Sequence, residues 1–128
     1  MTPLLENWKT SSMRLKTSWK TNNDEIVLGD VVDYLGDETV DVNVLELSQQ
    51  LPPLQTQEAK RVAAASLKYP IIIVKRNGKY QYVLDGNHRL QKAIDEEVEN
   101  IKAKILDLDN PETPENFKRL FEGIHLNE

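Results

Sequence analysis

Five consecutive residues, Asp85, Gly86, Asn87, His88 and Arg89, stand where a strand-like run ends and a helix-like run begins. The N-terminus of a helix presents unpaired N–H groups and the positive end of the helix dipole, and both favour a bound anion. Gly86 lets a ligand approach the backbone, Arg89 can hold a phosphate through two parallel hydrogen bonds, and His88 can donate a hydrogen bond or transfer a proton. The pattern predicts a phosphate-binding turn.

The same turn also has a purely structural interpretation. Asp85 or Asn87 can serve as the N-cap of the following helix, and Gly86 can serve the turn alone. In the ligand-site interpretation, Asp85 can orient Arg89, hold Mg²⁺ or act as a base on a hydroxyl group. Cations are unfavourable in the first turn of a helix, so His88 and Arg89 weigh against a plain surface turn. Both interpretations stay open at this point.

The composition places limits on the rest of the molecule. The 128 residues are 39% hydrophobic and 29% charged, which is typical of one soluble globular domain. No apolar run is long enough to cross a membrane, and no signal segment opens the chain. The chain has no cysteine, which excludes disulfides and thiolate chemistry and fits a cytoplasmic location.

Charge is distributed unevenly along the chain. Residues 1–23 carry four Lys or Arg and one Glu, whereas residues 24–56 carry eight acids and no Lys or Arg. We therefore predict a basic N-terminal arm over 1–23 and a folded domain over 24–128. The arm contains Trp8 and Trp19, which can stack on nucleic-acid bases or pack on the domain, and packing is the favoured interpretation.

The hydrophobic pattern predicts an α+β domain with a small mixed sheet and packed helices. Asn77-Gly78 is the strongest hairpin signal, because both residues tolerate positive φ. Gly29 and Gly36 indicate turns or breaks, and Thr56 is a candidate N-cap. The predicted elements are strands over 40–45, 70–75, 79–85 and 100–108, and helices over 57–68, 88–97 and 113–124.

Residues 70–106 resemble the core of the ParB/sulfiredoxin superfamily, which has a hairpin, a G-x-x-R turn that opens a helix, and a further strand. Gly86-Asn87-His88-Arg89 occupies that turn. The strand and helix predicted upstream extend the resemblance to about 40–108. The resemblance implies a ParB/sulfiredoxin-like fold.

The function that the resemblance implies depends on the branch. Sulfiredoxins carry G-C-H-R, and the absence of cysteine excludes their chemistry. ParB partition proteins carry G-E-R-R and bind CTP, and this chain differs from them at Asn87 and His88. The free-serine kinases carry D-G-H-H-R, from which Asp85–Arg89 differs at one position. This branch implies a nucleoside triphosphate or diphosphate with Mg²⁺, and phosphoryl transfer or nucleotide hydrolysis.

The residues implied for this chemistry divide into two groups. Gly86, Asn87, His88 and Arg89 would bind phosphate, whereas Asp85, His88 and Glu46 would be catalytic. Glu46 follows the first predicted strand, where the kinase branch carries an acid.

The alternative function is a ParB-like DNA-binding or nuclease accessory module that uses the basic arm. The chain has no P-loop and no G-x-S-x-G motif, and His88 and His125 are too few and too far apart for a zinc site. No resident metal site is predicted, and the oligomeric state is left open.

Overall fold

The computed structural model describes residues 17–126, with side chains up to residue 122. The chain divides into two units. The sheet unit is Thr39–Asp109, and the terminal unit combines the segments on either side of it, Met1–Glu38 and Asn110–Glu128.

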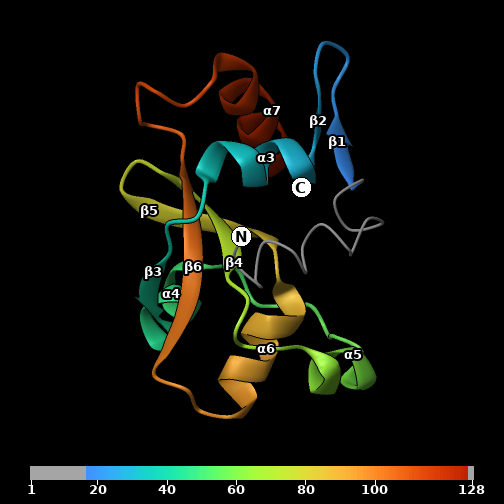
Figure 1. Ribbon diagram of the computed structural model, residues 1–128, viewed down its shortest axis with the longest axis vertical. Coiled ribbons are helices and arrows are strands. Elements are labelled where there is room, and N and C mark those ends of the chain that lie inside the picture. Colours follow the sequence, from blue (N-terminus) through green and yellow to red (C-terminus); the bar gives the residue numbers. More distant parts are fainter. Residues whose placement is uncertain (1–16, 127–128) are drawn as a thin grey trace. The chain divides into compact units, whose positions relative to one another are not determined.

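The sheet unit contains a four-stranded mixed sheet with the order β3-β6-β4-β5 (Figure 1). Its strands are β3 (Val40–Asn43), β4 (Ile71–Arg76), β5 (Lys79–Asp85) and β6 (Asn100–Asp107). β6 runs antiparallel to β3 and parallel to β4, and β4 runs antiparallel to β5. The prediction of an α+β protein with a small mixed sheet is confirmed.

The hairpin between β4 and β5 follows directly from the sequence. Asn77 and Gly78 have φ of 55° and 75°, as a two-residue turn with two left-handed positions requires. Arg76 and Lys79 pair on either side of the turn. The β-branched residues that open β4 are fully buried, which fits an interior strand: Ile71, Ile72, Ile73 and Val74.

Three helices belong to the sheet unit: α4 (Val44–Gln50), α5 (Ala59–Ala64) and α6 (Asn87–Asp95). α6 starts immediately after β5, and α5 packs beside it (Figure 1). Leu90 and Ala93 of α6 and Leu47 of α4 are buried in one hydrophobic cluster with residues from β3, β4 and β6. The cluster fixes α6 against the sheet, because apolar burial stabilises this packing.

Two predicted elements in this unit have wrong boundaries, and the helix predicted over 88–97 spans Asn87–Asp95. The strand predicted over 40–45 ends at Asn43, because the Asn43 side chain accepts a hydrogen bond from the Glu46 N–H at 2.9 Å and caps α4. The helix predicted over 57–68 spans only Ala59–Ala64, and its N-cap is Glu58 rather than Thr56.

The early end of α5 has a visible cause. The Lys92 ammonium group donates hydrogen bonds to the carbonyls of Ala63 and Ala65, at 3.0 and 2.7 Å. A cation at the end of a helix satisfies carbonyl groups that would otherwise need the next helical turn. None of the six residues of α5 is buried, so burial gives little support for a longer helix.

Within its described residues, the terminal unit contains a hairpin and two helices. The hairpin pairs β1 (Ser18–Lys20) with β2 (Glu25–Val27), and the helices are α3 (Leu28–Leu35) and α7 (Glu115–Leu126). Gly29 lies inside α3, so its prediction as a turn or break is wrong. The predicted boundary between residues 23 and 24 falls in the turn that joins β1 to β2.

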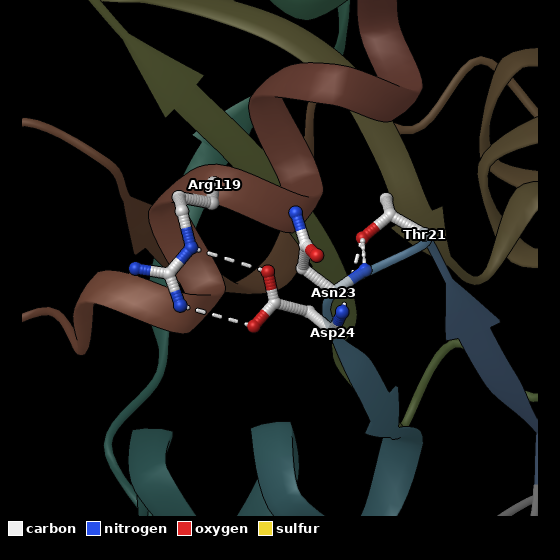
Figure 2. A network of polar contacts seen from close by, with 4 residues as sticks. All are labelled: Thr21, Asn23, Asp24 and Arg119. Atoms are coloured by element: carbon white, nitrogen blue, oxygen red, sulfur yellow. Dashed lines mark hydrogen bonds and ion pairs between the residues drawn. The ribbon is translucent and has the colours of Figure 1, made fainter.

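Aromatic side chains hold the terminal unit together. Trp19 lies edge-on to Phe121, with ring centroids 5.5 Å apart, and Tyr34 lies edge-on to Phe117 at 5.6 Å. Figure 2 shows a polar link in the same unit, in which Arg119 of α7 donates two hydrogen bonds, of 3.2 and 3.0 Å, to the Asp24 carboxylate. Segments from the two ends of the sequence are therefore joined by packing and by charge.

Candidate functional site

The turn at residues 85–89 begins with a glycine that no other residue can replace without strain. Gly86 is the N-cap of α6 with φ of 108°, and its carbonyl accepts the first helical hydrogen bond, from Leu90, at 3.0 Å. A Cβ at this position would lie 2.5 Å from Cγ2 of Ile71. Glycine is needed here for its positive φ and for the close packing of the turn on β4.

Arg89 turns inward from this helix start. The residue is only 5% exposed, and its Nη1 group donates a hydrogen bond to the Pro70 carbonyl. Its Nη2 group lies 3.7 Å from Oδ2 of Asp85, whose side chain is 16% exposed. The guanidinium therefore joins the end of β5, the start of α6 and the residue before β4. This arrangement favours the interpretation in which Asp85 and Arg89 position the turn.

Asn87 and His88 differ from Arg89 in their surroundings. Both are half-buried, and in the described part of the chain their side chains have no hydrogen-bond partner. Both lie in the first turn of α6, where backbone N–H groups have no intrahelical partner. These two side chains and the helix N–H groups are the parts of the turn that can contact an anion.

A groove of about 700 Å³ lies between α6 and the segment that contains α5. From α6 it is lined by Gln91, Lys92 and Asp95, and Glu96, which follows the helix, also lines it. Its other side is formed by Leu54, Gln55, Thr56, Gln57, Ala59, Val62 and Ala63. Its volume lies within the range of small-molecule pockets.

On α6, the groove lining begins one helical turn after Asn87 and His88, on the same side of the helix. Gln91 and Lys92 follow Asn87 and His88 by four residues, and residues four apart on a helix are neighbours on its surface. The next turn adds Asp95, whose carboxylate accepts a hydrogen bond from the Gln91 amide at 2.8 Å. Beyond the first turn of α6, the groove thus offers amide, ammonium and carboxylate groups along the helix.

Glu46 lies in a different part of the sheet unit. It is exposed in the first turn of α4, and the Gln50 amide donates a 3.5 Å hydrogen bond to it. The pKa of Tyr80 is raised, first by burial and then by the negative charge of Glu46. Tyr80 precedes Asp85 by five residues along β5, a separation of about 17 Å. The structure does not bring Glu46 to the turn.

The structure bears on metal ligands, membrane-spanning helices and the predicted basic arm only within the residues that it describes. Among residues 17–126, no group of three or more His, Asp or Glu residues is arranged to hold a metal ion, and no helix could span a membrane. Residues 1–16 of the predicted basic arm, including Trp8, lie outside the described residues.

Sequence reasoning missed two contributors to the turn. Ile71 excludes a side chain at position 86, and Pro70 accepts the Arg89 hydrogen bond. Pro70 stands directly before a buried strand, where its carbonyl has to find a donor. The need for a donor to the Pro70 carbonyl was the signal present in the sequence, but the sequence does not show that Arg89 is this donor.

Comparison with protein-family models, with curated proteins and with solved structures finds no significant match to this protein. Membership of the ParB/sulfiredoxin superfamily therefore stays a prediction.

Proposed function

We propose that the sheet unit has a ParB/sulfiredoxin-like fold and binds a nucleoside triphosphate or diphosphate along α6. The phosphates would lie at the first turn of α6, and the nucleoside would occupy the groove. The proposal is supported by the spacing of α6, which puts Asn87 and His88 one helical turn before the groove residues Gln91 and Lys92 and on the same side of the helix. A helix N-terminus and an adjoining groove suit the two halves of a nucleotide.

The residues of the turn take different roles in this proposal. The first N–H groups of α6 and the side chains of Asn87 and His88 would contact phosphate oxygens. Asp85 and Arg89 would hold these groups in place, since the two side chains face one another at 3.7 Å. Glu46 has no role at the turn, because it lies toward the other end of β5.

The reaction class supported best is phosphoryl transfer or nucleotide hydrolysis. The acceptor, a hydroxyl group or water, forms a bond to phosphorus as the bond to the leaving phosphate oxygen breaks. The imidazole of His88 lies at the turn and is partly exposed. It would take up the proton that the attacking hydroxyl group or water loses. The cysteine-free composition supports a cytoplasmic location.

Mg²⁺ fits this site as a partner of the nucleotide. It commonly binds through substrate phosphates and one or two carboxylates, and Asp85 is the carboxylate at the turn where the phosphates would lie. When bound, the ion would neutralise phosphate charge.

Thermal unfolding in the presence of nucleotides tests the proposal. We expect purified protein to melt at a higher temperature with at least one nucleoside diphosphate or triphosphate, tested with and without Mg²⁺, because ligand binding stabilises the folded state. His88→Ala and Asn87→Ala should reduce the shift without lowering the melting temperature of the free protein. Asn23→Ala, in the terminal unit, is the matched control and should keep the full shift.

The absence of a shift with every nucleotide would overturn the proposal. Binding to DNA that weakens steeply with salt, without any nucleotide effect, would instead favour a nucleic-acid module.

A further inference from the structure

The turn between β4 and β5 combines a reactive sequence with an exposed backbone. Asn77 and Gly78 are both exposed, and a Cβ built on Gly78 would meet nothing within 4 Å. In the described part of the protein, the Asn77 side chain has no hydrogen-bond partner. The Asn77 amide is therefore open to attack by the backbone nitrogen of the following residue, which has no side chain to hinder it.

A second feature restrains the same turn. The Asn77 N–H donates a hydrogen bond to Oδ2 of Asp109, which follows β6, and the Asp109 N–H donates to Asp107 at 2.9 Å. The Leu108 N–H also donates to the Lys75 carbonyl, at 2.9 Å. These bonds fix the hairpin to the end of β6 and hold the backbone of Asn77 at φ of 55°.

We propose that Asn77 is a site of spontaneous deamidation and that the Asp109 carboxylate controls its rate. The Gly78 backbone nitrogen gives its proton to a base in solution and forms a bond to Cγ of Asn77. The bond between Cγ and the amide nitrogen Nδ2 breaks and nitrogen leaves as ammonia, so that a five-membered succinimide remains. Water then opens this ring at one of its two carbonyls and yields aspartate or isoaspartate at position 77. No oxidant or reductant is needed.

Asp109 acts on this reaction through the backbone. Ring closure requires the Asn77–Gly78 peptide to rotate until the Gly78 nitrogen reaches Cγ. The hydrogen bond from the Asn77 N–H to Asp109 opposes that rotation, because it fixes the residue on one side of the moving peptide. The bond should therefore slow the reaction in the folded protein relative to the unfolded protein.

The products should loosen the hairpin. Aspartate or isoaspartate at position 77 places a new carboxylate beside the Asp109 carboxylate, and like charges repel. Isoaspartate also adds a methylene group to the main chain, which a two-residue turn between paired strands cannot absorb without a change in register. Ageing of the protein would thus separate this hairpin from the end of β6.

Timed peptide mapping of the full-length protein at mildly alkaline pH tests the proposal. We expect modified Asn77 to accumulate faster than modified Asn43 or Asn100, which precede the hindered residues Val44 and Ile101, and to accumulate faster as pH rises. The same protein in denaturant provides the unrestrained rate. Asn77 that stays intact in the folded protein while other asparagines react would overturn the site.

The role of Asp109 has its own test. Asp109→Ala should raise the folded-state rate several-fold toward the denatured rate, whereas Asp109→Asn keeps an acceptor oxygen and should stay near the parent rate. If Asp109→Ala proves unfolded in a melt, two other measurements test control by Asp109. They are the deamidation rate of Asp109→Asn and the ratio of the folded-state rate to the denatured-state rate in the parent protein. Equal folded and denatured rates in the parent would overturn control by Asp109.

Asn77→Gly is the control for the expected loosening of the hairpin. It tolerates positive φ and lacks the reactive amide, so its melting temperature should not fall on incubation while that of the parent does. An equal fall in both proteins would show that the hairpin is not what weakens with age.

Discussion

The guanidinium of Arg89 and the carboxylate of Asp85 face one another at 3.7 Å, inside a turn for which the sequence alone allows either a ligand site or a purely structural role. The pair is shielded from solvent, with side chains 7% and 16% exposed. Arg89 also donates to the Pro70 carbonyl. A charge in the first turn of a helix, which is unfavourable by itself, is thus balanced from within the protein.

Arg89→Ala should therefore destabilise the sheet unit. It leaves the Asp85 carboxylate and the Pro70 carbonyl without this partner, and we expect a loss of roughly 1–3 kcal/mol in the free energy of unfolding. Denaturant unfolding measures the loss. The control is Arg61→Ala, whose ion pair with Glu58 is exposed and should contribute less than about 1 kcal/mol. Equal effects of the two substitutions would contradict a structural role for Arg89.

Gly86→Ala should cost more stability than Gly78→Ala. Both residues have positive φ, so each substitution strains the backbone by about 1–2 kcal/mol. The new Cβ at position 86 also meets Ile71, whereas that at position 78 meets open space. Overpacking adds roughly 1–3 kcal/mol at Gly86. Unfolding of the two variants side by side isolates the contact, and equal losses would show that the turn can move away from β4.

The Asp24–Arg119 link should make the stability of the terminal unit depend on pH. The hydrogen bond from Arg119 lowers the pKa of Asp24 below its ordinary value of 3.8, and the same bond raises the pKa of Arg119. A depressed carboxyl pKa gives stability that is fully present above the ordinary pKa of the unfolded protein. That stability is lost as pH falls through the lower, folded-state value.

Arg119→Gln isolates this link (Figure 2). The melting temperatures of parent and variant should differ at neutral pH and converge once pH falls below the folded-state pKa of Asp24. Lys20→Gln, which removes an exposed ion pair with Glu25 at 3.8 Å, should have little effect at either pH. A difference between parent and Arg119→Gln that persists undiminished in acid would mean that Arg119 acts through packing.

Trp19→Ala should weaken the terminal unit, even though residue 19 belongs to the segment predicted as an arm. The indole is half-buried and packs edge-on against Phe121, so we expect a loss of about 2 kcal/mol. Lys20→Ala, the neighbouring exposed position, should stay within about 0.5 kcal/mol of the parent. Thermal or denaturant unfolding compares them, and an unchanged Trp19→Ala protein would restore the independent arm over residues 1–23.

Local chemistry explains the elements that the sequence determined by itself. Asn77 and Gly78 accept positive φ at little cost, so the hairpin was predictable from two residues. The β-branched run at 71–74 indicated a buried strand. The change from strand to helix near Gly86 identified the turn. In each case neighbouring residues carry the whole signal.

Tertiary contacts decided the remainder. The Lys92 ammonium group meets the end of α5 from another helix. The order β3-β6-β4-β5 and the parallel pairing of β4 with β6 depend on residues far apart in the sequence. For the charged residues of the turn, the sequence left two positions open, one facing a ligand or solvent and one paired within the protein. The fold directs Arg89 inward to Pro70 and Asp85, because a buried guanidinium needs acceptors that only the folded protein brings within reach.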